Sequence, residues 1–163
     1  MLNRKLLIGT SGGDNVVING NFESVEPPVI GSGTWTYPVD WRLRYFNTSS
    51  TKKSFYEKMV APAKSRWVLN CDIDDGVYLD YTVPTGNYAI LNVKWGCSGG
   101  YGLGTWGVYF NGTWYHRSGS RFEETTTVIP VAAGTGGSLT LWCSKSGGRG
   151  DSASSFIYRV WTE

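Results

Sequence analysis

Aromatic residues flank an Asn111-Gly112 pair, the most favourable sequence for a two-residue β-hairpin turn. Such a turn sets Tyr109 opposite Trp114. Strand alternation then predicts a core-facing set, Trp106, Val108, Phe110 and Tyr115, and an exposed set, Tyr109, Trp114 and His116. An exposed aromatic cluster stacks on sugar rings, contacts a partner protein, or packs beneath a loop of its own chain. The sequence leaves these three interpretations open.

Motifs for catalysis do not occur in the sequence. It has one histidine, His116, and no G-x-S-x-G, H-E-x-x-H or Walker pattern. The carboxylates of Glu23, Glu57, Glu123 and Asp80 are of the type that glycosidases pair, but no spacing brings two of them together. We therefore expect a protein that is not an enzyme and that carries no cofactor.

Composition favours a single all-β domain. The chain has 163 residues, 15% of them aromatic, and 22 glycines that interrupt short apolar runs. The net charge of +2 comes without a basic stripe, which argues against nucleic acid as a partner. No run of about 18 apolar residues occurs, so we expect no membrane span.

The apolar pattern predicts about ten short strands in a two-sheet antiparallel β-sandwich. The first expected strand covers 15–23 and bends at Gly20. Strands at 66–71 and 77–83 are expected to form a hairpin around Asp75-Gly76. Alternation in the next strands assigns an inward set, which is Val77, Leu79, Tyr81, Val83, Ala89, Leu91, Val93 and Trp95.

The three cysteines are Cys71, Cys97 and Cys143, an odd number without a C-x-x-C pair. All three fall within or at the ends of apolar strands, which favours buried free thiols over the alternatives of a disulfide or a metal site. Near the start, Arg4 and Lys5 precede an apolar block of only three residues, 6–8. A secretory signal needs about 7 to 15 apolar residues, so we expect a protein made in a cytoplasm.

Four stretches in order resemble galactose-binding-like jelly-roll domains, the fold of many carbohydrate-binding modules. They are "NVVINGNFE" (15–23) with a later Trp, "LDYTVPTGNYAILNVKW" (79–95), "IPVAAGTGGSLTLWC" (129–143) and the final "FIYRVWTE". The resemblance implies a jelly roll in which Gly20 permits a bend and Phe22 enters the core. It also implies a structural calcium site at Glu23 and nearby carbonyls, although no Asp precedes Glu163 in the last strand.

We expect an N-terminal arm at 1–13 and a jelly-roll domain at 14–163. The arm carries four apolar side chains, Leu2, Leu6, Leu7 and Ile8, which we expect to contact another subunit. The start of the chain is similar to the starts of small bacteriophage virion proteins. The resemblance implies a structural protein of the virion, such as a head-decoration, head-fibre or tail-fibre component, which forms a homo-oligomer and contacts other virion proteins. The alternative is a carbohydrate-binding module or lectin that binds a cell-surface glycan through exposed aromatic residues.

Overall fold

All regular secondary structure in the described part of the chain is β, as the composition predicts. The computed structural model describes residues 13–23, 38–45, 53–59, 64–72, 75–99, 103–132, 135–147 and 152–163. No helix in these ranges is long and apolar enough to cross a membrane. The predicted arm residues Leu2, Leu6, Leu7 and Ile8 lie outside the described residues.

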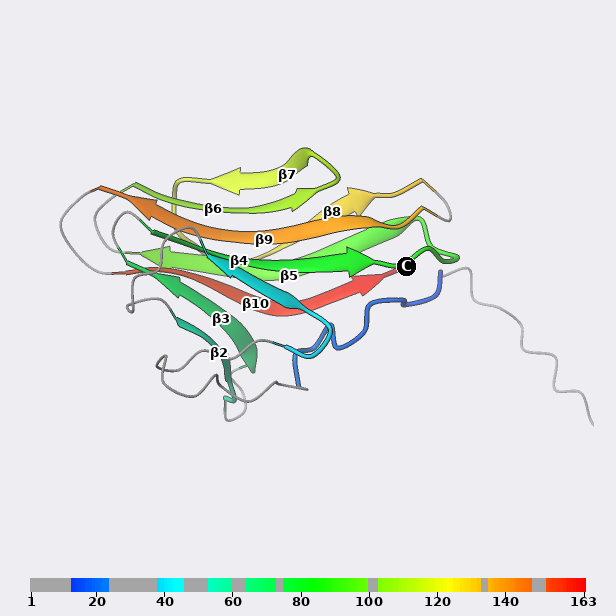
Figure 1. Cartoon of the computed structure of the whole chain (residues 1–163), viewed down its shortest axis with the longest axis horizontal. Helices are drawn as coiled ribbons and strands as arrows, with labels where there is room; N and C mark the ends of the chain where they lie inside the picture. The colour runs from blue at the N-terminus through cyan, green and yellow to red at the C-terminus, as the bar shows by residue number, and fades with distance from the viewer. Residues whose placement is uncertain are drawn as a thin grey trace, which may run out of the picture.

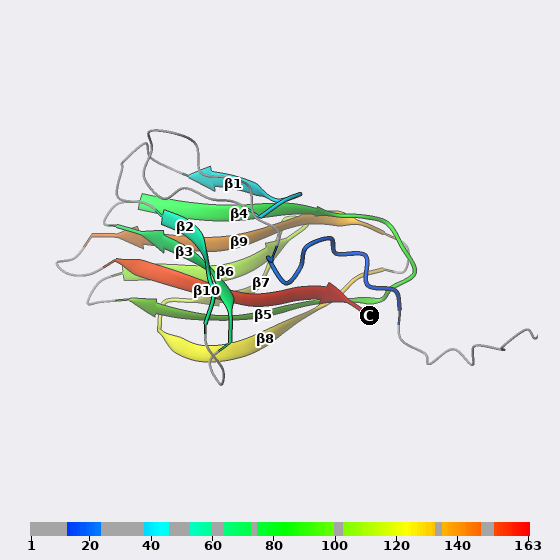
Figure 2. The same ribbon diagram turned by 90° about the horizontal axis from the view of Figure 1, so that it is seen from below.

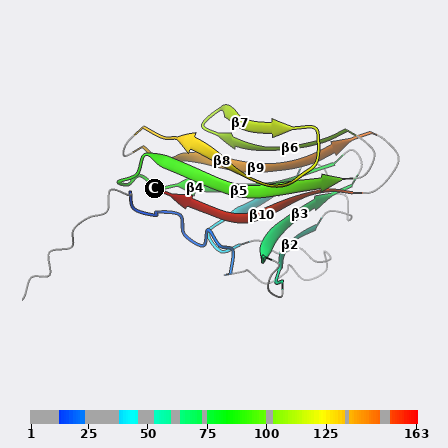
Figure 3. The same cartoon turned by 180° about the vertical axis from the view of Figure 1, so that it is seen from behind.

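In the described ranges, ten strands form two antiparallel sheets of five strands each, which stack face to face (Figures 1 and 3). The first sheet has the order β1 (Arg42–Tyr45), β4 (Asp75–Val83), β9 (Gly137–Ser146), β6 (Leu103–Phe110) and β7 (Thr113–Ser118). The second sheet has the order β2 (Lys53–Glu57), β3 (Arg66–Cys71), β10 (Ala153–Thr162), β5 (Ile90–Gly99) and β8 (Phe122–Pro130). The predicted jelly-roll β-sandwich is confirmed.

The core lies between the sheets and contains the residues that alternation assigns to it. In β4, Leu79 is fully buried, and in β5, Leu91 and Val93 are fully buried as well. There are two exceptions: Ala89 precedes β5 and is exposed, and Tyr115 of β7, which alternation also assigns to the core, is 38% exposed. Burial of these apolar side chains is the largest favourable contribution to folding, and it fixes which side of each strand faces outward.

The expected strand at 15–23 does not form. Its backbone amides bond mainly to side chains instead of a neighbouring strand: Val16 N–H donates to Thr162 Oγ1 at 2.8 Å and Ile18 N–H to Tyr81 Oη at 2.9 Å. Asn19 and Phe22 have positive φ values of 50° and 62°, which a strand cannot accommodate. The segment therefore follows the end of β10 as an irregular chain (Figure 2).

The roles expected for Gly20 and Phe22 are nevertheless found. Val160 N–H donates to Gly20 O at 2.9 Å, and a Cβ at Gly20 would collide with the Val160 carbonyl oxygen. Directly beyond this contact, the Phe22 ring is fully buried, 5.1 Å from the ring of Trp41. The close approach at Gly20 thus brings Phe22 into the core.

The prediction of a hairpin around Asp75-Gly76 is wrong. Asp75 and Gly76 begin β4, which pairs with β1 and β9, whereas β3 pairs with β2 and β10. The two strands lie in opposite sheets because each has an inward apolar stripe that needs the facing sheet as its partner. Consecutive strands β3 and β4 therefore belong to different sheets and do not form a hairpin.

Candidate functional site

The β6–β7 hairpin carries the aromatic residues that the sequence singles out. Asn111 and Gly112 form its turn with φ values of 46° and 84°, both in the left-handed region that this tight turn requires. The Asn111 side chain accepts a 2.8 Å hydrogen bond from Ser138 N–H of β9, which ties the turn to the sheet. Tyr109 stands opposite Trp114, as predicted, and their ring centroids are 5.2 Å apart.

His116 does not join this pair, so the expected grouping of all three residues on one face is wrong. The register shifts between Val108 and Tyr109, which leaves Tyr115 as an extra residue in β7. His116 therefore pairs with the core residue Val108 and points inward. A bulge reverses the alternation of inward and outward residues beyond it. A period-2 pattern in the sequence therefore could not predict that His116 points inward.

Inside the sandwich, His116 lies among aromatic rings. Its ring is 5.0 Å from Trp95 and 5.3 Å from Phe122, and its Nδ1 is 3.4 Å from Thr127 Oγ1. Burial lowers the pKa of His116 below its usual value. The side chain is therefore suited to packing as a neutral imidazole.

The outer face of the first sheet, which points away from the second sheet, carries Tyr109 and Trp114 within a larger array. Residues directly paired across strands share a face, and these pairs define two parallel rows. The first row is Arg44, Tyr78, Trp142, Gly107 and Arg117. The second row is Arg42, Asp80, Thr140, Tyr109 and Trp114.

Four aromatic rings of this array are in continuous contact. The ring of Tyr78 lies 4.2 Å from that of Trp142, which lies 5.3 Å from Trp114, which in turn touches Tyr109. Gly107 makes room for this contact, because a Cβ there would lie 2.5 Å from Cζ3 of Trp114. Trp142, Trp114 and Tyr109 are each only partly buried, so their rings present apolar surface to solvent.

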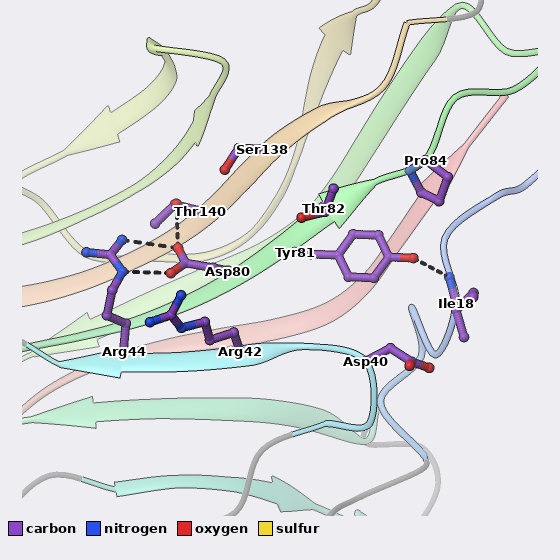
Figure 4. Close-up of a pocket in the computed structure, with 10 residues that line it drawn as sticks. All are labelled: Ile18, Asp40, Arg42, Arg44, Asp80, Tyr81, Thr82, Pro84, Ser138 and Thr140. Carbon is purple, nitrogen blue, oxygen red and sulfur yellow. Dashed lines mark hydrogen bonds and ion pairs between the residues drawn. The ribbon is translucent and has the colours of Figure 1, made fainter.

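A hollow of about 560 Å³ lies where β1, β4 and β9 meet (Figure 4). Its lining residue Thr140 pairs with Tyr109, so the hollow adjoins the aromatic rings. Asp80 is held at its wall: Arg44 donates to both carboxylate oxygens, at 2.7 and 3.1 Å, and Thr140 Oγ1 donates at 2.6 Å. The hydrogen bond to Asp80 raises the pKa of Arg44 above its usual value. Arg44 therefore stays charged, and the three hydrogen bonds fix the position of the Asp80 carboxylate.

Other polar groups line the same hollow. Arg42 is exposed and makes no hydrogen bond or ion pair within the described part of the chain. Thr82 and Ser138 face each other across β4 and β9 and add two hydroxyl groups. A sugar presents a C–H face and hydroxyl groups. The apolar rings match the C–H face, and the polar hollow matches the hydroxyl groups.

Sequence reasoning missed Arg44, Tyr78, Asp80 and Trp142 as site residues. The signal was partly present, since alternation in 77–83 already assigns Tyr78 and Asp80 to the outside. What the sequence lacks is the order β4–β9–β6, which brings Tyr78 and Trp142 next to the hairpin.

Glu23, the expected calcium ligand, is an exposed residue at the end of the first described segment. The described residues contain no group of three or more His, Cys, Asp or Glu side chains that could hold a metal ion. A calcium site at Glu23 stays a prediction.

No protein-family model matches the sequence, and no curated protein matches it. Solved structures do share the fold. The carbohydrate-binding module TmCBM61, in complex with β-1,4-galactotriose, superposes with a TM-score of 0.50 and 14% identity, over 92% of this chain and 98% of that one. A family 11 carbohydrate-binding module from Clostridium thermocellum gives a TM-score of 0.47 and 11% identity over 94% and 95% of the two chains.

A third structure is the enzymatically active domain of tailspike protein 4 of bacteriophage CBA120. It superposes with a TM-score of 0.52 and 13% identity over 91% of this chain. The chain spans only about a fifth of that domain, since 21% of it is covered. At such identities the likeness shows the fold alone, which is a jelly-roll β-sandwich that carbohydrate-binding modules also adopt.

Proposed function

We propose that this chain is a non-catalytic glycan-binding module and that the outer face of the first sheet is its binding surface. The observation that carries the proposal is that one sheet face holds both four aromatic rings in contact with one another and a polar hollow. The fold supports it as well, because TmCBM61, which is solved with a galactotriose, has a similar sandwich.

The two parts of the surface suit different parts of a sugar. Trp114 and Tyr109 offer partly exposed rings against which the C–H face of a pyranose stacks. Asp80, Arg42, Thr82 and Ser138 offer acceptors and donors for hydroxyl groups. Because Arg44 and Thr140 already fix Asp80, its carboxylate loses little conformational freedom when a ligand binds.

Two features of the surface support binding over catalysis. The only histidine of the chain, His116, points into the sandwich and is not available to a ligand on the outer face. Two carboxylates line the hollow, Asp80 and Asp40, and Asp80 is engaged by Arg44 and Thr140. We therefore assign Asp80 to holding hydroxyl groups and not to proton transfer.

A glycan array followed by calorimetry on the best ligand tests the proposal. We expect Trp114→Ala and Tyr109→Ala each to weaken binding about tenfold or more, because each removes a stacking surface. Tyr158→Ala is the matched control: Tyr158 lines a second hollow, of about 580 Å³, to which β3, β10, β5 and β8 of the second sheet contribute residues. Equal losses in all three variants, or full binding by the Trp114→Ala Tyr109→Ala double variant, would overturn the assignment of the face.

The likeness to a tailspike domain favours a second, compatible candidate. We propose that the module belongs to a bacteriophage particle, made in the host cytoplasm and displayed on the virion by its N-terminal arm. Its test is separate from glycan binding: mass spectrometry of purified particles should detect the chain, and its absence from particles of a phage that encodes it would exclude the role.

A further inference from the structure

Two cysteines from opposite sheets meet in the core. Cys71 ends β3 in the second sheet and Cys143 lies in β9 of the first sheet (Figure 1). Their Sγ atoms are 3.6 Å apart, and both side chains are fully buried. The contact therefore spans the sandwich from one layer to the other.

The third cysteine is placed differently. Cys97 of β5 is also buried, but its Sγ donates to Ser120 O at 3.6 Å. Cys143 Sγ has a further neighbour in Ala153 O, at 3.5 Å, so it lies between a carbonyl oxygen and the Cys71 thiol. Among the three thiols, Cys71 and Cys143 are the pair in direct contact.

We propose that Cys71 and Cys143 form a latent inter-sheet disulfide, which closes when the chain folds in an oxidising medium and is then shielded from reductants. Closing the bond requires the distance between the two sulfurs to shorten from 3.6 Å to about 2.05 Å. The proposal is independent of what the outer face binds.

The chemistry balances with a disulfide reagent such as glutathione disulfide. One cysteine thiolate attacks the reagent, forms a mixed disulfide and releases one glutathione thiolate. The second cysteine thiolate then attacks the protein sulfur of that mixed disulfide, so the Cys71–Cys143 bond forms and a second glutathione leaves. The protein loses two electrons and two protons, and two glutathione molecules carry them away.

The timing of the reaction follows from burial. Thiolates are the reactive species, and burial raises the pKa of Cys143 well above its usual value, with Cys71 adding to the effect. No reagent reaches either sulfur in the closed sandwich. The bond must therefore form before the sheets close, and the folded protein then preserves the redox state in which it folded.

Refolding the full chain from denaturant tests this inference directly. One sample refolds with a glutathione disulfide and glutathione mixture, the other with dithiothreitol. After alkylation in denaturant, we expect one alkylated cysteine, Cys97, in the first sample and all three in the second. A peptide map should show the link between Cys71 and Cys143. Both samples should give the same far-ultraviolet β spectrum.

Stability and variants complete the test. The bond joins residues 72 positions apart, so the oxidised form should unfold at a urea midpoint higher by roughly 1 to 3 M. Cys97→Ala should still close the bond, and Cys71→Ala should retain two alkylatable thiols. Three alkylated cysteines in oxidised wild type, a bond that includes Cys97, or rapid reduction of the folded oxidised protein by dithiothreitol would each overturn the proposal. If Cys71→Ala does not fold, the counts of alkylated cysteines in the wild type and in Cys97→Ala are enough to decide whether the bond forms.

Discussion

His116, the only histidine in the chain, is held in an apolar niche that opposes its protonation. Its pKa in the folded protein lies below the usual value of 6.5, because burial disfavours the imidazolium. In the unfolded chain the side chain regains its usual pKa. Below about pH 6.5 the unfolded state therefore binds more protons at His116 than the folded state does. The free energy of unfolding then falls as the pH falls.

We expect the urea midpoint of the wild type to fall between about pH 7.5 and about pH 5.5. In His116→Phe, which keeps an aromatic ring beside Trp95, this fall should be much smaller. The measurement is urea unfolding followed by tryptophan fluorescence at both pH values. An equal fall in the variant would show that other groups cause the pH dependence.

The hairpin of β6 and β7 is the element that presents the proposed stacking surface, and two of its glycines serve it in different ways. A Cβ at Gly107 would lie 2.5 Å from both the Trp114 ring and the His116 carbonyl oxygen. A Cβ at Gly112 would meet nothing within 4 Å, although its φ of 84° disfavours any other residue.

These two glycines give a matched pair of substitutions. Gly107→Ala should displace the Trp114 ring and reduce glycan affinity about tenfold, and should also destabilise the fold. Gly112→Ala should cost about 1 kcal/mol of stability through backbone strain while affinity stays the same. Calorimetry and urea unfolding separate the two effects. Unchanged affinity in Gly107→Ala would disconnect the hairpin from binding.

How far the sequence predicts an element depends on how local its causes are. The Asn111-Gly112 turn, the Tyr109–Trp114 pair and the inward stripe of β4 follow from residues a few positions apart, and all were predictable. The bulge at Tyr115 was not, because a period-2 pattern carries no sign of a shift in register. Tyr78 and Trp142 come together only through the β4–β9 register, which no short window of sequence contains.

The segment 13–23 shows the same limit in another form. Its apolar alternation predicts a strand, but its amides bond to Thr162 and Tyr81 side chains contributed by distant strands. The role of Gly20 was anticipated only through the resemblance to jelly-roll domains, which implies a bend at this glycine and a buried Phe22.

Gly20→Val tests this element. The new side chain would collide with the Val160 carbonyl oxygen and separate the segment from β10, so we expect a loss of about 1 to 3 kcal/mol in unfolding free energy. Ile18→Val is the control, since Ile18 is 57% exposed and should change stability little. A Gly20→Val midpoint equal to that of wild type would mean that the chain can shift there without cost.

Across the whole molecule, the start and the end of the described chain meet at one end of the sandwich (Figures 1 and 3). Asp14 N–H donates to Asn87 O at 2.7 Å, and Glu163 N–H donates to Ile90 O at 2.9 Å. A Cβ at Gly13 would lie 2.5 Å from the Glu163 carbonyl carbon, which shows how closely the two ends approach. The first described residue, Gly13, therefore lies beside the last residue, Glu163, at that end of the sandwich.

Deletion of residues 1–12 separates the two proposed roles of the chain, anchoring and binding. Gly13 is retained because it packs against Glu163 and Asn87. We expect the truncated protein to fold, to keep its calorimetric affinity for a soluble glycan, and to be monomeric in sedimentation.

The full chain should form an oligomer, because burying Leu2, Leu6, Leu7 and Ile8 against another subunit contributes several kcal/mol, by about 25 cal/mol for each Å² of apolar surface. On a glycan-coated surface the oligomer should then bind about a hundredfold more tightly than the truncated form, since several sites act together. Equal sedimentation of the two proteins would reject the arm as an assembly device, while glycan binding by both would leave the outer face intact as the binding surface.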